Sequence, residues 1–166
     1  MKQIEMTELD RLRHSSAHIM AAAVCRIYND VQLDIGPPTE DGFYYDFEMN
    51  ERISTEDFSK IEHAMQEIIA EDHPFTCQEV SREQATEMLK GQTYKLERLA
   101  DIPEGDPITF FTCGEFTDLC RGPHVESTGK VKAFQLVNVA GSYYRGKETN
   151  PMLQRLYGTA FSNPKE

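Results

Sequence analysis

Two histidines lie four residues apart near the start of the sequence, in the segment His14-Ser-Ser-Ala-His18. Apolar and small residues recur around them at helical spacing, which predicts a helix over residues 6 to about 30, beginning at Met6. Positions i and i+4 of a helix share one face, so both imidazoles can reach a single metal ion or bound water. Two ligands do not complete a metal site, and the rest of the chain must supply the others.

The segment Asp118-Leu-Cys120-Arg-Gly-Pro-His124 offers two further ligands, a thiol and an imidazole on either side of a Gly-Pro turn. The sequence therefore predicts a fold that brings Cys120 and His124 against His14 and His18. A mixed set of imidazole and thiolate ligands suits tetrahedral zinc. The spacing alone leaves three interpretations open: a catalytic cluster, a structural zinc clamp that ties the first helix to a sheet, and side chains that form ordinary hydrogen bonds.

Charge is distributed unevenly along the 166 residues, whose formal net charge is −11. Residues 1–119 carry 10 Lys/Arg and 25 Asp/Glu, a balance of −15, whereas residues 120–166 carry 7 Lys/Arg and 3 acids, a balance of +4. This asymmetry predicts that a polyanion approaches the C-terminal third, although a solvated basic surface is an equally good interpretation. The overall negative charge argues against tight, non-specific binding of nucleic acid.

Composition and segment patterns indicate a globular cytoplasmic protein. No apolar run approaches the roughly 18 residues of a membrane span, and the first residues lack the apolar stretch of a secretory signal. The four cysteines show no paired spacing, so we expect free thiols in a reducing compartment rather than disulfides. The length fits one domain, or one domain with a small subdomain, and we expect residues 1–166 to form a single domain.

The remaining pattern mixes strands and helices. Alternation and turn residues predict strands over residues 31–35, 42–47, 75–80, 108–113, 133–140 and 153–161. Helical periodicity and capping signals predict helices over residues 54–72 and 81–91, with a helical turn over residues 94–99. This order predicts a two-layer α+β fold, with an antiparallel sheet and helices packed on one face.

Five segments occur in one order along the chain. They are His14–His18, Gly42-Phe-Tyr-Tyr-Asp-Phe47, Asp118–His124, Val139-Ala-Gly-Ser-Tyr-Tyr-Arg-Gly146 and Met152-Leu-Gln-Arg-Leu-Tyr-Gly-Thr-Ala160. Together they resemble the editing domain of bacterial-type threonyl-tRNA synthetase, in the superfamily that includes alanyl-tRNA editing domains. The resemblance covers about residues 12–161. It implies a single aminoacyl-tRNA editing domain without an aminoacylation core or anticodon-binding domain, either excised from a synthetase or free-standing.

The resemblance implies hydrolysis of mischarged Ser-tRNA(Thr), so that the 3′ end of tRNA(Thr) carrying serine is the expected partner. Serine lacks one methyl of threonine, and a synthetic site rejects a smaller analogue by only about 1–3 kcal/mol, so fidelity needs a second, hydrolytic site. The remaining synthetase domains are further partners if the domain is excised. Two other functions stay open: a non-catalytic tRNA- or protein-binding module, and a deacylase of another small aminoacyl-tRNA such as Ala-tRNA.

The resemblance also implies a set of site residues. The catalytic pocket is expected to be lined by His14, His18, Cys120 and His124, with Asp118 beside them. Lys95 falls where the family has a functional lysine, although an ordinary surface lysine is the alternative. Arg121 is a candidate for contacts with the terminal phosphates, and Tyr44 or Tyr45 for the pocket wall, although tyrosines are more often core residues.

The resemblance leaves the cofactor open between none and Zn²⁺. In alanyl-type relatives the same pattern of histidines and cysteine is a zinc site, whereas threonyl-type domains do not bind zinc dependably. With zinc, the ion would polarise the ester carbonyl or acidify water. Without it, a neutral His14 would activate water while Lys95 stabilises the developing oxyanion. We expect this metal-free catalytic state, with zinc able to occupy the cluster of His14, His18, Cys120 and His124.

Overall fold

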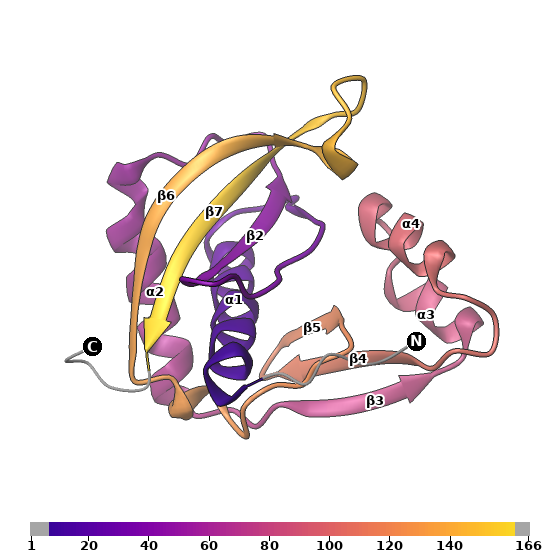
Figure 1. The fold of residues 1–166 in the computed structure, drawn as a ribbon, viewed down its shortest axis with the longest axis horizontal. Coiled ribbons are helices and arrows are strands. Elements are labelled where there is room, and N and C mark those ends of the chain that lie inside the picture. Colours follow the sequence, from indigo (N-terminus) through magenta and orange to yellow (C-terminus); the bar gives the residue numbers. More distant parts are fainter. Residues whose placement is uncertain (1–6, 162–166) are drawn as a thin grey trace.

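Helix α1 (Glu8–Ile27) lies at the centre of the fold in the computed structural model, which describes residues 7–161 (Figure 1). Thr7 caps the helix: its hydroxyl accepts a hydrogen bond from the Asp10 amide at 3.0 Å, and the Asp10 carboxylate accepts one from the Thr7 amide. The predicted start at Met6 lies outside the described residues. Three consecutive alanines, residues 21–23, are buried, and their small side chains let α1 pack closely on its neighbours.

Four strands form the larger sheet, which is antiparallel and has the order β1-β2-β7-β6. They are β1 (Gln32–Leu33), β2 (Phe43–Glu48), β6 (Ala133–Tyr143) and β7 (Met152–Phe161). Helices α1 and α2 (Phe58–Glu71) pack against one face of this sheet, as Figure 1 shows. Alternate residues of β2 point into this interface, where Phe43, Tyr45 and Phe47 join the main hydrophobic core.

A smaller antiparallel sheet, in the order β3-β4-β5, lies to one side of the larger one (Figure 1). Its strands are β3 (Thr76–Val80), β4 (Ile108–Cys113) and β5 (Phe116–Leu119), and helices α3 (Arg82–Met88) and α4 (Thr93–Asp101) lie between β3 and β4 in the chain. These elements have their own small core, formed by Ala85, Leu89, Leu99, Ile108 and Phe110. The described residues also form three short 3-10 helices: η1 (Thr55–Asp57), η2 (Thr128–Lys130) and η3 (Tyr144–Gly146).

The α+β class with antiparallel pairing is confirmed, but the strands divide between two sheets rather than one. The division follows from the separate apolar core beneath α3 and α4, which Ile108 and Phe110 of β4 join, whereas Cys113 at the end of β4 belongs to the main core. Sequence patterns do not predict β5, a short strand after the turn at Gly114. They predict only a helical turn where α4 extends over 9 residues. Within residues 7–161, no helix is long and apolar enough to cross a membrane.

Candidate active site

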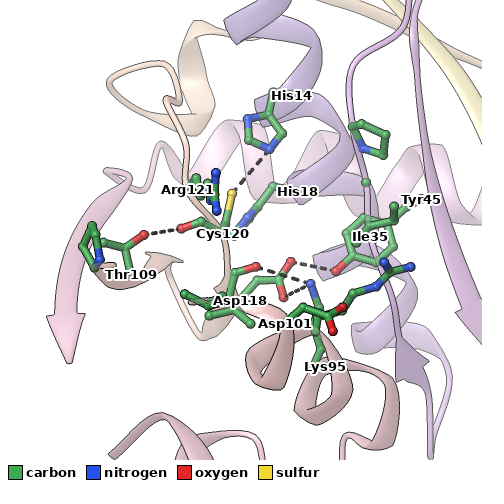
Figure 2. A pocket seen from close by; sticks show the side chains of 16 residues that line it. His14, His18, Ile35, Tyr45, Lys95, Asp101, Thr109, Asp118, Cys120 and Arg121 are labelled. Carbon is green, nitrogen blue, oxygen red and sulfur yellow. Dashed lines mark hydrogen bonds and ion pairs between the residues drawn. The ribbon is translucent and has the colours of Figure 1, made fainter. Parts of the chain in front are cut away.

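A cleft of about 430 Å³ lies where α1 and the larger sheet meet α4 and the smaller sheet. Figure 2 shows its lining from close by, with side chains contributed by α1, the loop after β1, β2, α4, β4 and β5. Seven of the candidate site residues line it: His14, His18, Tyr45, Lys95, Asp118, Cys120 and Arg121. His124, also expected to line the pocket, is not among the lining residues but contacts Cys120. The fold therefore brings together residues from four distant parts of the chain.

His14, Cys120 and His124 form a tight group at this cleft. Cys120 Sγ lies 3.4 Å from His14 Nε2 and 3.4 Å from His124 Nε2. The other nitrogen of each ring also has a partner: His14 Nδ1 donates to the Pro123 carbonyl at 3.1 Å, and His124 Nδ1 lies 3.0 Å from Ser15 Oγ. When neutral, His14 thus carries its proton on Nδ1, and its Nε2 lone pair faces the Cys120 thiol.

Burial keeps this group uncharged. It lowers the pKa of His14 below its usual value and that of His124 to about 2. Burial also raises the pKa of Cys120 to about 12, with the charge of Asp118 as a smaller cause. At neutral pH, Cys120 and His14 are therefore a thiol and a neutral imidazole, not a thiolate and an imidazolium. A thiol is a poor nucleophile, whereas a neutral imidazole is a competent base.

His18 lines the cleft but lies outside the group of His14, Cys120 and His124. Its ring packs edge-on against Phe75 and Phe116, with centroid separations of 5.3 and 4.8 Å. The side chain is 2 % exposed, its Nε2 has no hydrogen-bond partner within residues 7–161, and burial lowers its pKa to about 4. Of the four ligands expected for one ion, the structure groups three. The His18 ring meets the His124 ring edge-on, with centroids 5.0 Å apart, but its nitrogens lie outside the group of ligand atoms.

The three grouped residues fit a zinc ion by their chemistry. Their ligand atoms, two imidazole nitrogens and one sulfur, lie within 4.8 Å of one another. Zinc bonds of about 2.0–2.3 Å place tetrahedral ligands roughly 3.5 Å apart, which the two contacts of 3.4 Å match. Hydrogen bonds with Pro123 and Ser15 orient the two rings, as outer partners do in zinc sites. Three protein ligands would leave one tetrahedral position for water or substrate.

Lys95, Asp118 and Tyr45 form a buried ionic network in the same cleft (Figure 2). Lys95 Nζ lies 2.9 Å from Asp118 Oδ1, and the Tyr45 hydroxyl donates to Asp118 Oδ2 at 2.7 Å. Lys95 is 3 % exposed, so it is a buried residue of the cleft and not an ordinary surface lysine. Burial and the Asp118 charge hold the pKa of Tyr45 well above its usual value, so its hydroxyl stays protonated and donates.

Two glutamines tie α4, and with it Lys95, to β1. The Gln92 side chain hydrogen-bonds to the backbone groups on either side of Gln32, at 2.8 and 3.0 Å. The Gln32 side chain hydrogen-bonds in the same way to the backbone groups on either side of Gln92, at 2.8 and 3.0 Å. Arg98 adds a bidentate ion pair with Asp34, at 2.8 and 3.0 Å. Isolated glutamines carry no sequence signal, so these contacts emerge only from the fold.

The two predicted substrate-contacting residues differ in position. Arg121 is exposed and lines the cleft. Tyr44 does not line it, which corrects its assignment to the pocket wall. Strand alternation turns Tyr44 to the other face of β2, where the Arg155 guanidinium lies 4.0 Å from its ring centroid. Tyr45, the other tyrosine considered, lines the cleft instead. Thr109, which no sequence pattern indicates, also lines it and donates to the Cys120 carbonyl at 2.6 Å.

Comparison with known proteins relates the chain to tRNA synthetases. The family model described as "Threonyl and Alanyl tRNA synthetase second additional domain" matches residues 108–157. A threonine–tRNA ligase of Staphylococcus epidermidis is 51% identical over 158 residues, which are 95% of this chain and 24% of that protein. Threonine–tRNA ligases of Geobacillus kaustophilus and Acetivibrio thermocellus are 52% and 50% identical over 92% and 95% of this chain. The chain belongs to the threonyl-tRNA synthetase editing-domain family.

The chain spans about a quarter of the length of these ligases, 24% to 25% of each. Within the editing domain, the matched range includes Asp118, Cys120 and His124 but not the histidines of α1 or Lys95 of α4. The structure brings these outlying residues to the matched segment. The editing domain thus builds its site across both sheets, and residues 108–157 alone supply only one side of it.

Proposed function

We propose that this editing domain hydrolyses the ester of Ser-tRNA(Thr) and so removes serine from the 3′ end of the tRNA. The observation that carries the proposal is a single cleft lined by the neutral imidazole of His14 and by the buried Lys95–Asp118 pair. Ester hydrolysis needs a base for the attacking water and positive charge for the developing oxyanion. A volume of about 430 Å³ suits an aminoacyl group with its terminal nucleoside.

We assign water activation to His14. Its Nδ1 proton is bound to the Pro123 carbonyl, which leaves the Nε2 lone pair to accept a proton, and its lowered pKa keeps it neutral. Cys120 is not the nucleophile in this mechanism. Covalent catalysis requires a thiolate, and a pKa of about 12 leaves Cys120 protonated at neutral pH. The reaction is therefore proposed as direct attack by water.

Lys95 is the proposed oxyanion-stabilising group. Asp118 and the Leu119 carbonyl, 2.9 and 3.4 Å from Lys95 Nζ, hold its ammonium group in the cleft, and Tyr45 orients the Asp118 carboxylate. A charge fixed in this way stabilises a developing oxyanion more strongly in a water-poor site than in solution, because the surrounding groups need not reorganise during the reaction. His18, whose Nε2 has no partner in the described chain, is proposed as an additional donor or acceptor for the substrate.

Zinc and water activation by His14 are mutually exclusive in this geometry. A zinc ion held by His14, Cys120 and His124 would act as a Lewis acid on the ester carbonyl or acidify bound water. It would also occupy the His14 Nε2 lone pair to which we assign water activation. We therefore propose the metal-free form as the catalytic one, with no cofactor required.

Selection of serine over threonine is proposed to be steric. Forcing one extra methyl into a well-packed site costs about 1–3 kcal/mol, and displacement of the ester from the attack geometry lowers the rate further. The residues around the reactive groups are tightly packed: Tyr45, His18, Lys95 and Asp118 are each exposed by 5 % or less. A pocket of this kind tolerates a smaller side chain better than a larger one.

Arg121, exposed at the cleft, is proposed to contact the terminal phosphates of the tRNA. The net charge of −11 implies that the isolated domain binds tRNA weakly and with strong salt dependence. We further propose that residues 1–166 act as one editing domain. In chains as long as the related ligases, the other synthetase domains would present the 3′ end of the tRNA to it.

Deacylation assays with Ser-tRNA(Thr), Thr-tRNA(Thr) and Ala-tRNA test this proposal. We expect the domain to hydrolyse the first and to spare the second. His14→Ala should abolish hydrolysis, whereas His63→Ala should not, because His63 is an exposed residue of α2 whose one ion pair within residues 7–161 is with Glu67. Preferred cleavage of Ala-tRNA would support an alanyl deacylase instead. Specific binding of tRNA without cleavage of any ester would support a non-catalytic module.

A further inference from the structure

The segment joining β6 to β7, residues 144–151, contacts α4 although it lies far from it in the sequence. We call this segment the hairpin end, and Figure 1 shows it reaching toward α4. Arg145 Nη2 donates to Asp101 Oδ2 at 2.6 Å. The Tyr144 ring lies 4.6 Å from the Tyr94 ring and 5.2 Å from the Arg98 guanidinium, measured to ring centroids. The first residues of the hairpin end, Tyr144 to Gly146, belong to one of the motifs that carry the family resemblance, yet the site described above makes no use of them.

The contacted residues of α4 share one face of the helix. Tyr94, Arg98 and Asp101 are spaced at i, i+4 and i+7, so they form a single stripe along α4. Lys95 is the next residue after Tyr94 and points into the cleft, where its Nζ meets Asp118. Together with the hydrogen bonds of Gln32 and Gln92, contacts along the stripe set the rotation and the axial position of α4. They therefore set where the Lys95 ammonium group lies.

The hairpin end is itself held in a defined shape. The Tyr144 amide donates to the Pro151 carbonyl at 2.9 Å, and the Asn150 side chain donates to the Tyr144 carbonyl at 2.8 Å. Arg145 adopts a left-handed backbone conformation with φ of 57°, which costs free energy in a non-glycine residue and aims its side chain at Asp101. Tyr144 and Tyr94 also form a small apolar cluster with Leu153 of β7, separate from both larger cores.

We propose that Tyr144 and Arg145 are positioning residues that fix α4 and thereby hold Lys95 in the cleft. The kinetic effect of these two residues rests on the proposed function, whereas their effect on the geometry of α4 does not. Neither residue lines the cleft. Both act on the reaction through Lys95, so their loss should slow the chemical step without weakening the capture of tRNA.

The test compares Arg145→Met with Lys147→Met. Both changes remove one positive charge from the hairpin end, but Lys147 is exposed and has no ion pair in the described structure, so only Arg145→Met breaks a contact with α4. We expect the single-turnover rate of Ser-tRNA(Thr) hydrolysis at saturating domain to fall roughly 3- to 10-fold in Arg145→Met, with an unchanged half-saturation concentration. Arg145→Lys should recover part of the rate, and Lys147→Met should keep the wild-type rate.

Hydrogen exchange of the backbone amides gives a second measurement that does not depend on activity. Arg145→Met should speed exchange in α4 several-fold and leave α1 unchanged, whereas Lys147→Met should alter neither helix. Unchanged exchange in α4 together with an unchanged rate would overturn the proposal. An equal rise of the half-saturation concentration in Arg145→Met and Lys147→Met, with no specific loss of rate in Arg145→Met, would also overturn it. The positive charges of the hairpin end would then serve only to attract tRNA. If the wild-type domain cleaves no aminoacyl-tRNA, the proposed function fails, and the exchange measurement alone decides the positioning role.

Discussion

Replacing Lys95 by methionine should destabilise the domain by about 3–5 kcal/mol, because it leaves a carboxylate buried without its counter-ion. Lys95 Nζ lies 2.9 Å from Asp118 Oδ1, and the two side chains are only 4% and 6% exposed. After the substitution, the Tyr45 hydroxyl would be the one remaining charge-stabilising contact of Asp118 that the structure describes. The expected loss is a large fraction of the total of about 5–15 kcal/mol that holds a typical domain folded.

Urea unfolding followed by circular dichroism measures this effect, and the double variant Lys95→Met/Asp118→Leu provides the control. Removing both charges leaves no unpaired ion, so the double variant should regain most of the lost stability, with a coupling free energy of about 2 kcal/mol or more. It should nevertheless stay inactive in deacylation, since Lys95 is the proposed oxyanion-stabilising group. A single variant that loses less than about 1 kcal/mol, with additive effects in the double variant, would refute the buried ion pair as a stabilising contact.

Three further measurements test other parts of the site. His18→Phe should flatten the pH dependence of stability between about pH 6.5 and 4, measured by urea unfolding at each pH. In the wild type, the folded pKa of His18, about 4, lies below its unfolded value, so the unfolded state takes up the proton first as the pH is lowered. The free energy of unfolding of the wild type therefore decreases as the pH falls through this window, by about 3 kcal/mol at most. Gly122→Ala should destabilise by about 1–3 kcal/mol and reduce hydrolysis, because Gly122 has φ of +68° and an added Cβ would lie 2.6 Å from the Phe111 ring; normal stability and activity would contradict this. Zinc affinity in calorimetry should rise with pH and drop in Cys120→Ser, since zinc must displace the Cys120 proton; a pH-independent affinity would argue against Cys120 as a ligand.

Local patterns predict much of the site because helix and strand periodicity fix the face on which a residue lies. The spacing of His14 and His18 places both on the cleft-facing side of α1, and the Gly-Pro turn brings Cys120 and His124 together. Periodicity does not determine which side chains from other parts of the chain a residue on that face will contact. His18 shares this face with His14, yet its ring packs edge-on against Phe75 and Phe116 and its nitrogens lie outside the metal-fitting group.

The division into two sheets could not be predicted from local patterns. Strand periodicity says which residues alternate, but the partner of a strand depends on which apolar surface it covers. β4 joins the small core through Ile108 and Phe110, while β2 joins the main core through Phe43 and Phe47. The choice between Tyr44 and Tyr45 for the pocket wall has the same origin. Adjacent residues of a strand face opposite sides, and only the fold shows which side meets the cleft.

The cleft lies between two apolar cores, and this position explains why polar contacts define it. A hydrolytic site must admit water, so neither core can extend across it. At the cleft, α4 is therefore held by hydrogen bonds and ion pairs. The glutamine pair of Gln32 and Gln92 and the Arg98–Asp34 pair connect it to β1 and the residue that follows β1, and the buried Lys95–Asp118 pair connects it to β5 of the smaller sheet. Such contacts are directional, unlike apolar packing, and fix a side chain to within a fraction of an ångström. A lysine that must meet a developing charge needs this kind of support.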